Sequence, residues 1–220
     1  MSELLNVLVV GATGGTGRAT VERLAAEGHR VTAFSRSADR LANEIDGITT
    51  VNGDVTDPHA VEQAVAGQDV VIVTLGITEN PLRVRFLGPA RTPINVRSQG
   101  TKHVISAMKK HGARRLIVQS SYGVGETQGF LGFTDQLLFS LLLKPQIADT
   151  EIQEQYVRAS GLDWVLAQPV HLKDDEATKP FLSTQGETRL MQVARQTVAK
   201  FLALAAHEEA YVGQSVTISG

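Results

Sequence analysis

Short apolar runs alternate with segments of helical apolar spacing along most of the 220-residue chain. The runs predict strands at Asn6–Val10, Arg30–Ser35, Thr49–Asn52, Val70–Leu75, Leu116–Ser120, Trp164–Ala167 and Ser215–Ile218. The helical spacing predicts helices near residues 16–27, 58–66, 94–111, 147–160 and 192–206. Within the fourth run, residues 70–73 are apolar at every position, which is typical of a parallel strand covered on both faces. The alternation predicts one α/β domain over residues 1–220, with a mostly parallel, doubly wound sheet of about seven strands and helices on both faces.

Turn chemistry marks several element ends and three longer connections. Asp57-Pro58 predicts a helix start, and Gly28 and Gly67 predict helix ends. The segment Thr150–Val157 reads as an amphipathic helix with Ile152, Tyr156 and Val157 facing inward. Three irregular segments, at 76–93, 121–146 and 170–190, each follow the carboxyl end of a predicted strand. Open α/β sheets bind ligands at that edge, so we expect the functional site there.

The turn after the first predicted strand reads Gly11-Ala12-Thr13-Gly14-Gly15-Thr16-Gly17. A strand, this Gly-x-x-Gly-x-x-Gly turn and a helix together are the signature of a Rossmann fold that binds a dinucleotide. The first glycine allows the tight turn, the middle one lets the backbone approach a diphosphate, and the last lets helix and strand pack closely. We expect cofactor contacts from Gly11, Thr13, Gly14, Gly15, Thr16 and Gly17. The alternative is an ordinary glycine-rich turn without a ligand.

Three later strand ends add to the expected cofactor site. The second strand ends in Ser35-Arg36, where an NAD-specific protein carries an acidic residue, and hydroxyls beside a guanidinium suit the 2′-phosphate of NADP(H). Arg18 could add a second charge, and a solvated surface role is the alternative for Arg36. Asp54 and Val55 after the third strand could meet the adenine, or form only a turn before the next helix. Leu75-Gly76 would bring backbone past the cofactor.

Composition narrows the class of protein further. The chain has 21 basic and 23 acidic residues spread along its length, so we expect no nucleic-acid or membrane surface. It has no cysteine, and its five histidines other than His171 show no metal-ligand spacing, so we expect no metal site. The start carries no basic leader pattern and the apolar stretch 130–143 is too short to span a membrane. We expect a cytoplasmic protein, monomeric or a weak homodimer.

The chain resembles the atypical short-chain dehydrogenase/reductases of the NAD(P)H-binding, NmrA-like group, and most of all the biliverdin-IXβ reductase/flavin reductase family. The resemblance covers nearly the whole chain and is loosest at 77–94 and 122–146. It is carried by Gly11–Gly17, Ser35-Arg36, Gly53–Val55, Val65–Ile72, Ala107–Gly112, Ser160–Trp164 and Gln168–His171. It implies reduction of a flavin or a similar planar acceptor by NADPH.

Catalytic residues are harder to predict than the cofactor site. Carbonyl-reducing short-chain dehydrogenases use a Tyr-x-x-x-Lys pair, but no tyrosine of this chain has lysine four residues later. In the resembled family, a serine matching Ser121 and a histidine matching His171 line the substrate site, so we expect both there. Tyr122 is a third candidate. For His171 and Tyr122 the alternatives are a histidine bound to backbone and a ring that covers the edge of the core.

The irregular segments are expected to set specificity. Segment 76–93 carries Arg83 and Arg85, with Arg91 near its end, and these could meet an acidic acceptor or could simply be solvated. Phe130–Phe133 and Leu137–Phe139 could form an apolar lid, or could serve core packing or a subunit contact.

The leading hypothesis is an NADPH-dependent oxidoreductase that transfers hydride to a small planar electron acceptor, such as a flavin, quinone or tetrapyrrole. Orientation and exclusion of water are the main demands of such a reaction, which fits the missing Tyr-x-x-x-Lys pair. The alternative is a non-catalytic NADP(H)-sensing regulatory protein of NmrA type. A sugar-nucleotide epimerase or dehydratase is disfavoured by the short chain and the missing pair.

Overall fold

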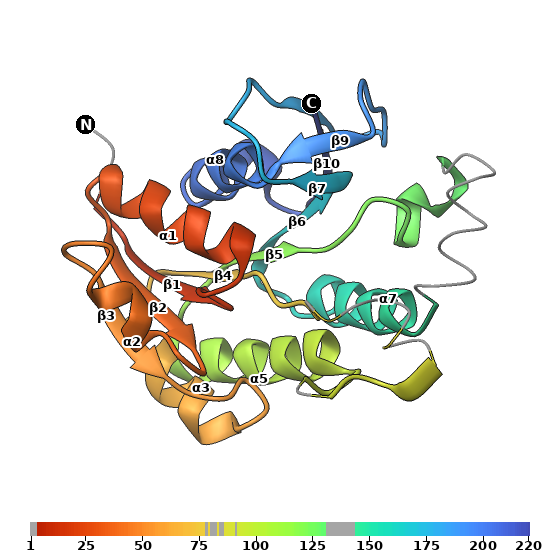
Figure 1. Ribbon diagram of the computed structural model, residues 1–220. Helices are drawn as coiled ribbons and strands as arrows, with labels where there is room; N and C mark the ends of the chain where they lie inside the picture. The colour runs from red at the N-terminus through yellow and green to blue at the C-terminus, as the bar shows by residue number, and fades with distance from the viewer. Residues whose placement is uncertain (1–3, 78, 80–82, 84–85, 91, 131–143) are drawn as a thin grey trace.

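An eight-stranded sheet forms the centre of the protein, and a computed structural model describes it for residues 4–77, 79, 83, 86–90, 92–130 and 144–220 (Figure 1). The strand order is β3-β2-β1-β4-β5-β6-β10-β8. The strands are β1 (Asn6–Val10), β2 (Arg30–Ser35), β3 (Thr49–Asn52), β4 (Val70–Val73), β5 (Arg115–Gln119), β6 (Asp163–Pro169), β8 (Phe181–Ser183) and β10 (Gln214–Ser219). Neighbouring strands are parallel except β8, which is antiparallel to β10. The predicted single-domain, doubly wound Rossmann fold is confirmed.

The seven predicted strands are all present, and the structure adds three that the pattern did not predict. One is β8, and the other two are β7 (His171–Lys173) and β9 (Gln192–Ala194), which pair in parallel as a separate small sheet. Each has only three residues, too few for the apolar alternation by which a strand is recognised. Segment 170–190, expected to be irregular, therefore contains the strands β7 and β8. The helix expected over 192–206 begins only after β9, at Arg195.

Helices cover both faces of the sheet (Figure 1). They are α1 (Gly15–Ala26), α2 (Asp39–Ala42), α3 (Pro58–Val65), α5 (Val96–His111), α7 (Lys144–Arg158) and α8 (Arg195–Ala205), with 3₁₀ turns η1 (Gly125–Phe130) and η3 (Glu209–Tyr211). Helices α1 and α8 pack together on one face, and α3, α5 and α7 on the other. Alternate residues of β1 serve the two cores: Val7 and Val9 join the α1 side, and Leu8 and Val10 the α5 side.

Several predicted helix ends are confirmed. The Asp57 carboxylate accepts a hydrogen bond from the His59 backbone N–H at 2.9 Å, with Pro58 in the first helical position of α3. Gly28 and Gly67 follow α1 and α3 with φ of 86° and 77°, the left-handed conformation that favours glycine after a helix.

The inward face of α7 differs from the prediction. Val157 is buried as expected, but Ile152 and Tyr156 are 42% and 38% exposed. Gln153 and Glu154 are buried instead, because their side chains form hydrogen bonds with polar residues of neighbouring elements. The apolar pattern misleads here, since it cannot identify a helix face that is buried through hydrogen bonds.

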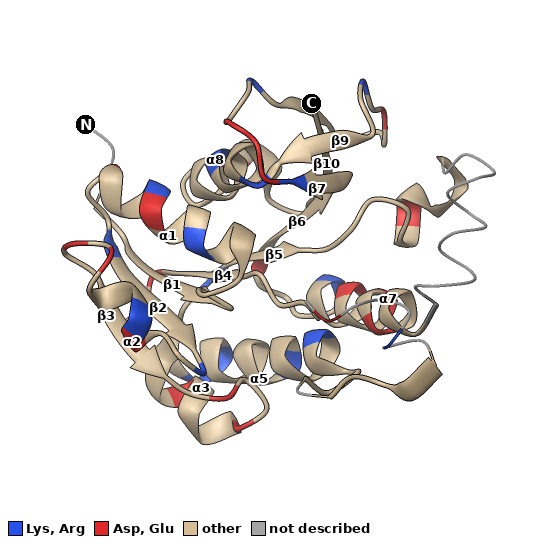
Figure 2. Cartoon of the chain, viewed as in Figure 1, with Lys and Arg blue, Asp and Glu red and all other residues tan. Residues whose placement is uncertain are grey.

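Acidic and basic residues both occur on α1 and α7, whereas α5 and α8 carry basic residues alone (Figure 2). The even mixture of charges along the sequence therefore does not extend to every helix. Within the described parts of the chain, no helix combines the length and the apolar character that crossing a membrane requires.

Candidate functional site

Two neighbouring cavities open at the carboxyl ends of the parallel strands. We call the first the turn cavity, because it lies over the glycine turn, and its volume is about 580 Å³. Of the predicted cofactor residues, it is lined by Gly11, Thr13, Gly14, Gly15, Thr16, Ser35, Arg36, Asp54, Val55, Leu75 and Gly76. The fold thus brings together residues from four strand ends in one hollow at the predicted edge of the sheet.

The glycine turn is held in shape by close backbone contacts. Gly11 has a φ of 85°, and a Cβ there would lie 2.8 Å from the carbonyl oxygen of Thr74. Gly17 lies beneath the cavity, where a Cβ would be only 2.2 Å from the carbonyl oxygen of Gly11. A Cβ at Gly14, in contrast, would meet only that same carbonyl, at 3.3 Å. Packing within the protein therefore requires the first and last glycines, and the middle one leaves backbone open toward the cavity.

Arg195 covers the start of α1. A Cβ on Gly15 would lie 2.6 Å from the Arg195 side chain, whose Nη1 donates to Asp174 Oδ1 at 2.6 Å. Arg195 is the first residue of α8 and lines the turn cavity. A guanidinium beside the free N–H groups of a helix start is suited to binding a phosphate.

Ser35 and Arg36 border the turn cavity at the end of β2, as predicted. Arg36 Nη2 donates to Thr92 Oγ1 at 3.3 Å, and its charge contributes to the low pKa of the Asp54 carboxyl. Arg18 does not contribute to this cavity, contrary to expectation. It forms ion pairs with Glu22 at 2.9 Å and Glu44 at 2.6 Å, because its position in α1 points it along the helix surface toward these carboxylates.

Asp54 forms a tight turn and also lines the cavity. Its Oδ1 accepts from the backbone N–H of Thr56 at 2.8 Å and from the Thr56 hydroxyl at 2.7 Å. The backbone hydrogen bond is the main cause of its lowered pKa, partial burial opposes it, and the Thr56 hydroxyl and Arg36 add to the lowering. Val55 packs against α5, where a Cβ on Gly100 would lie 2.6 Å from it.

The second cavity, which we call the rim cavity, has a volume of about 190 Å³. It is lined by Arg97, Gln119, Ser120, Ser121, Tyr122, Pro169, Val170, His171, Leu172 and Met191. Three of these, Arg97, Gln119 and Leu172, also line the turn cavity. The two cavities therefore share a wall, and a ligand in one can lie next to a ligand in the other.

The three predicted catalytic residues meet at the rim cavity with different surroundings. Ser121 Oγ donates to the carbonyl of Tyr122 at 3.2 Å. The Tyr122 hydroxyl donates to the carbonyl of Gly186 at 3.2 Å, and burial raises the pKa of Tyr122 although a hydrogen bond with Thr188 opposes the shift. His171 is exposed on β7, and its backbone N–H donates to the carbonyl of Met191.

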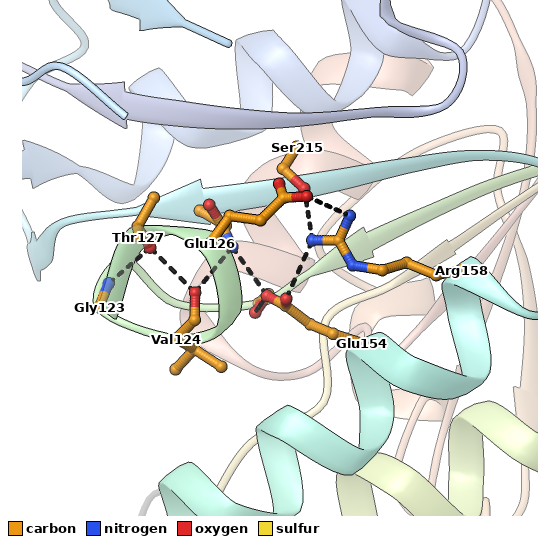
Figure 3. Close-up of polar contacts among 9 residues, drawn as sticks. Gly123, Val124, Glu126, Thr127, Glu154, Arg158 and Ser215 are labelled. Atoms are coloured by element: carbon orange, nitrogen blue, oxygen red, sulfur yellow. Dashed lines mark hydrogen bonds and ion pairs between the residues drawn. The ribbon is translucent and has the colours of Figure 1, made fainter. Parts of the chain in front are cut away.

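A polar network supports the loop that carries Ser121 and Tyr122. Figure 3 shows Arg158 of α7 between Glu126, Glu154 and Ser215. Its Nη1 lies 3.2 Å from Glu126 Oε1, and its Nη2 lies 3.3 Å from Glu154 Oε2 and 2.8 Å from Ser215 Oγ. The loop after β5 is thereby tied to α7 and β10.

The same network reaches the end of β5 through a buried carboxylate. Glu154 Oε1 accepts from the Ser120 hydroxyl and, at 2.9 Å, from Gln168 Nε2. In the loop itself, Thr127 Oγ1 accepts from the Gly123 N–H at 2.9 Å and donates to the Val124 carbonyl at 3.0 Å (Figure 3). A buried carboxylate with this many partners fixes the loop that forms one wall of the rim cavity.

The cavity walls suit an anionic dinucleotide. Of the described residues, three arginines line the turn cavity, Arg36, Arg97 and Arg195, against two carboxylates, Asp54 and Glu79. Positive charge, open backbone at Gly14 and the cradle formed by the turn all fit the phosphates of a nicotinamide cofactor. Among the described side chains, no cluster of histidine and carboxylate groups could hold a metal ion.

The cavity residues that were not predicted from the sequence include Arg97, Gln119 and Arg195. A signal for two of them was present. Arg97 and Arg195 lie in the first turns of α5 and α8, where the helix dipole disfavours a positive charge. A basic residue in that position is a local conflict, and such conflicts gather at functional sites. Nothing comparable marks Gln119, which ends an apolar strand.

Comparison with known proteins places the chain among dinucleotide-binding proteins. A family model described as NAD(P)H-binding matches residues 11–209. The chain is 37% identical over 128 residues to a 3-diazoavenalumate denitrifying reductase of a Streptomyces species, a match that covers 57% of this chain and 40% of that protein. It is 33% identical over 120 residues to a 2-alkyl-3-oxoalkanoate reductase of Stenotrophomonas maltophilia, covering 54% of this chain and 34% of the relative. The chain thus spans less than half the length of these two relatives.

Solved structures match over nearly the whole chain. The anaerobilin reductase ChuY of Escherichia coli O157:H7 is 25% identical, with a TM-score of 0.78, over 97% of this chain and 96% of that one. A short-chain dehydrogenase/reductase of Veillonella parvula, solved with NADP, has a TM-score of 0.79 at 21% identity over 99% of this chain and 95% of that one. The second likeness bears on the fold alone.

Proposed function

The chain belongs to the NAD(P)H-binding family, and from this premise we propose that it is an NADPH-dependent reductase of a small planar acceptor. The observation that carries the proposal is the wall shared by the turn cavity and the rim cavity. A dinucleotide along the turn cavity would place its nicotinamide end near that wall, and the rim cavity would hold the acceptor beside it. Hydride transfer needs this proximity.

We assign the cofactor as NADP(H) rather than NAD(H). Ser35 and Arg36 supply hydroxyl and guanidinium donors for a 2′-phosphate, and the strand end carries no acidic residue. Gly14, Gly15 and Arg195 would hold the diphosphate. Asp54 and Val55 would face the adenine, and Leu75 and Gly76 would pass beside the cofactor.

The assignment of a planar acceptor is supported by the family resemblance and by the names of similar proteins. The resemblance to biliverdin-IXβ and flavin reductases concerns planar acceptors, and the 25% identical neighbour of nearly the same length is named an anaerobilin reductase. The two curated relatives described above are also named reductases. The arginines and lid residues proposed for specificity lie partly outside the described residues, namely Arg85, Arg91, Leu131–Phe133 and Leu137–Phe139. Of the rest, Arg83 and Phe130 are described.

The residues of the rim cavity would orient the acceptor and limit water. NADPH supplies the hydride when it is bound. Ser121 would donate a hydrogen bond to the acceptor, because its hydroxyl otherwise makes only a local contact. His171, exposed at the rim, would donate a proton to the reduced acceptor, because it lines the rim cavity. The Tyr122 hydroxyl is bonded to Gly186, so we assign Tyr122 to shaping the cavity.

Turnover measurements test this proposal. Purified protein is mixed with NADPH and each of FMN, riboflavin, quinones and biliverdin, and the loss of nicotinamide absorbance is followed. We expect oxidation with at least one acceptor, reduced about tenfold to a hundredfold by His171→Ala and by Ser121→Ala. His207→Ala and Ser106→Ala, at exposed positions away from both cavities, should leave the rate unchanged.

The same experiment separates the reductase from the regulatory alternative. Tight NADPH binding without oxidation of any acceptor would contradict the reductase and favour a non-catalytic NADP(H) sensor. Oxidation that is insensitive to both rim variants would leave the reductase standing but remove the roles of Ser121 and His171.

A further inference from the structure

Two buried polar groups without partners lie at the wall shared by the two cavities. Within the described part of the chain, Arg97 Nη1 and Gln119 Oε1 are buried and make no hydrogen bond. Other buried side-chain atoms in this condition, on Gln68, Gln153, Gln168 and Thr217, line neither cavity. Leaving a buried donor or acceptor unpaired costs about 1–3 kcal/mol, so such groups at a cavity wall indicate a ligand that completes them.

No carboxylate among the described residues forms a direct ion pair with the guanidinium of Arg97. Asp149 of α7 is the nearby carboxylate, but it accepts from the backbone N–H groups of Arg97 and Ser98 at 2.9 and 3.2 Å and from the Ser98 hydroxyl. These contacts cap the start of α5. The guanidinium therefore extends toward Gly76, where a Cβ would lie 3.1 Å from Arg97 Nη2. Burial lowers the pKa of Arg97, and the charge of Asp149 opposes the shift.

Gln119 supplies the complementary chemistry. It is the last residue of β5, is 8% exposed, and its amide makes no hydrogen bond with any described residue. Arg97 can only donate, whereas Gln119 Oε1 accepts. A single ligand group that satisfies both must carry an acceptor and a donor close together.

We propose that Arg97 and Gln119 form a binding site for an amide group, a C=O beside an N–H, at the junction of the two cavities. Arg97 would donate to the carbonyl oxygen and Gln119 would accept from the N–H. Two ligands of the reductase carry this chemistry: the carboxamide of the nicotinamide, and the imide or lactam edge of a flavin or tetrapyrrole. The second source rests on the proposed reductase function, and the first needs only cofactor binding. A simple quinone lacks the N–H.

The cofactor arm of the test compares two oxidised dinucleotides by calorimetry. NADP⁺ carries the carboxamide, and its 3-acetylpyridine analogue has a methyl group in place of the amino group. If the carboxamide is the ligand, Gln119→Met lowers the affinity for NADP⁺ about tenfold and leaves the affinity for the analogue unchanged. Arg97→Lys, which keeps a charge but withdraws the donor, weakens both ligands, because both carry the carbonyl.

The acceptor arm uses protein saturated with NADP⁺ and compares riboflavin, which has an imide N–H between two carbonyls, with menadione, which has carbonyls only. If the acceptor supplies the group, Gln119→Met weakens riboflavin about tenfold and menadione not at all. Gln68→Met is the matched control in both arms, because it also removes a buried, unpartnered glutamine oxygen but lies away from the cavities. Should Gln119→Met unfold, Gln119→Leu serves in its place, because it also removes the acceptor oxygen, leaves Arg97 unaltered and should give the same amide-selective loss.

An amide-selective loss in either arm supports the proposal and identifies the source. Unchanged affinities in both arms, or equal losses for ligands with and without the N–H, overturn it. Failure of the reductase itself is read separately, as an absence of NADPH oxidation. If riboflavin does not bind the unaltered protein, the cofactor arm alone decides.

Discussion

The turn cavity and the rim cavity adjoin each other but are built differently. The turn cavity is formed at the ends of β1 to β4 by short stretches that follow directly on a strand, and its shape depends on backbone, as at Gly11 and Gly17. The rim cavity is assembled from the loop after β5 and from side chains of β5, β6, β7, α5 and the residue before β9. Backbone therefore shapes the first cavity, and side chains with long-range partners shape the second.

This difference has an energetic consequence. A backbone-built wall is part of the fold, so a change there alters stability and cofactor binding together. A side-chain wall supported by hydrogen bonds can change its chemistry while the sheet persists. We expect variants of residues that line only the turn cavity to lose the cofactor, and variants of residues that line only the rim cavity to lose only the acceptor.

The largest effect is expected from Gly17→Ala. Its methyl group would lie 2.2 Å from the carbonyl oxygen of Gly11, so α1 must shift away from β1. Overpacking of this kind costs about 3 kcal/mol of unfolding free energy, and we expect NADPH binding to be lost with it. Urea unfolding and calorimetry measure the two effects.

The matched control is Gly129→Ala in η1, where an added Cβ meets nothing within 4 Å. Its stability should change by less than about 0.5 kcal/mol. If Gly17→Ala behaves like the control, close backbone packing does not shape the turn cavity.

The second largest effect is expected from Arg36→Asp. This variant tests an exception to the comparison, because at this point of the backbone-shaped turn cavity a side chain determines which cofactor binds. The change replaces a phosphate donor by a carboxylate that repels phosphate. We expect NADPH affinity to fall about 100-fold and NADH affinity to change by less than about threefold.

Fluorescence titration with both cofactors provides the measurement. Arg30→Asp, at the exposed start of the same strand, is the control for the charge change. Equal losses for NADPH and NADH would contradict the assignment of the 2′-phosphate to Arg36.

A smaller effect is expected from Tyr122→Phe on the rim side. The variant removes the hydrogen bond to the Gly186 carbonyl but keeps the buried ring. Unfolding free energy should fall by about 1 kcal/mol, and NADPH affinity should be unchanged. Tyr156→Phe, at a half-exposed position on α7, should have no effect. Loss of NADPH affinity in Tyr122→Phe would show that the cavities are not separable.

The same contrast explains what the sequence could predict of the fold. Residues 70–73, apolar throughout, and the capped start at Asp57 reveal a strand and a helix, because the signal is local. The three-residue strands β7, β8 and β9 carry no such signal, since they form only where other elements offer an edge. The prediction of the buried face of α7 was wrong for a related reason. Gln153 is buried with a hydrogen bond to Thr101, which lies far away in the sequence.

The candidate site divides along the same line. Gly11 to Gly17 and Arg36 follow from spacing after a strand, and the structure gathers nearly all of them around one cavity, although their roles stay predictions. Arg195 lies over Gly15 only because α8 packs on α1, a contact that no local pattern encodes. Arg97 carried a signal in its unfavourable position at a helix start, and Gln119 carried none.

The smallest expected effect is the pH dependence of Asp54→Asn, and it tests whether side-chain charge stabilises the turn cavity at all. Hydrogen bonds from Thr56, with a contribution from Arg36, lower the pKa of Asp54 in the folded protein. The stabilisation from the carboxylate is therefore fully present above the pKa of this aspartate in the unfolded chain, about 3.9. It is lost as the pH falls through the lower pKa of the folded protein. Without cofactor, the variant should melt slightly below the unaltered protein at neutral pH, and the difference should shrink and then vanish as the pH falls below the pKa of the unfolded chain. Thr56→Val, which removes only the hydroxyl donor, should show a smaller part of the same trend. A melting difference that persists unchanged at the acid end would mean that the Asp54 turn depends on shape and not on charge.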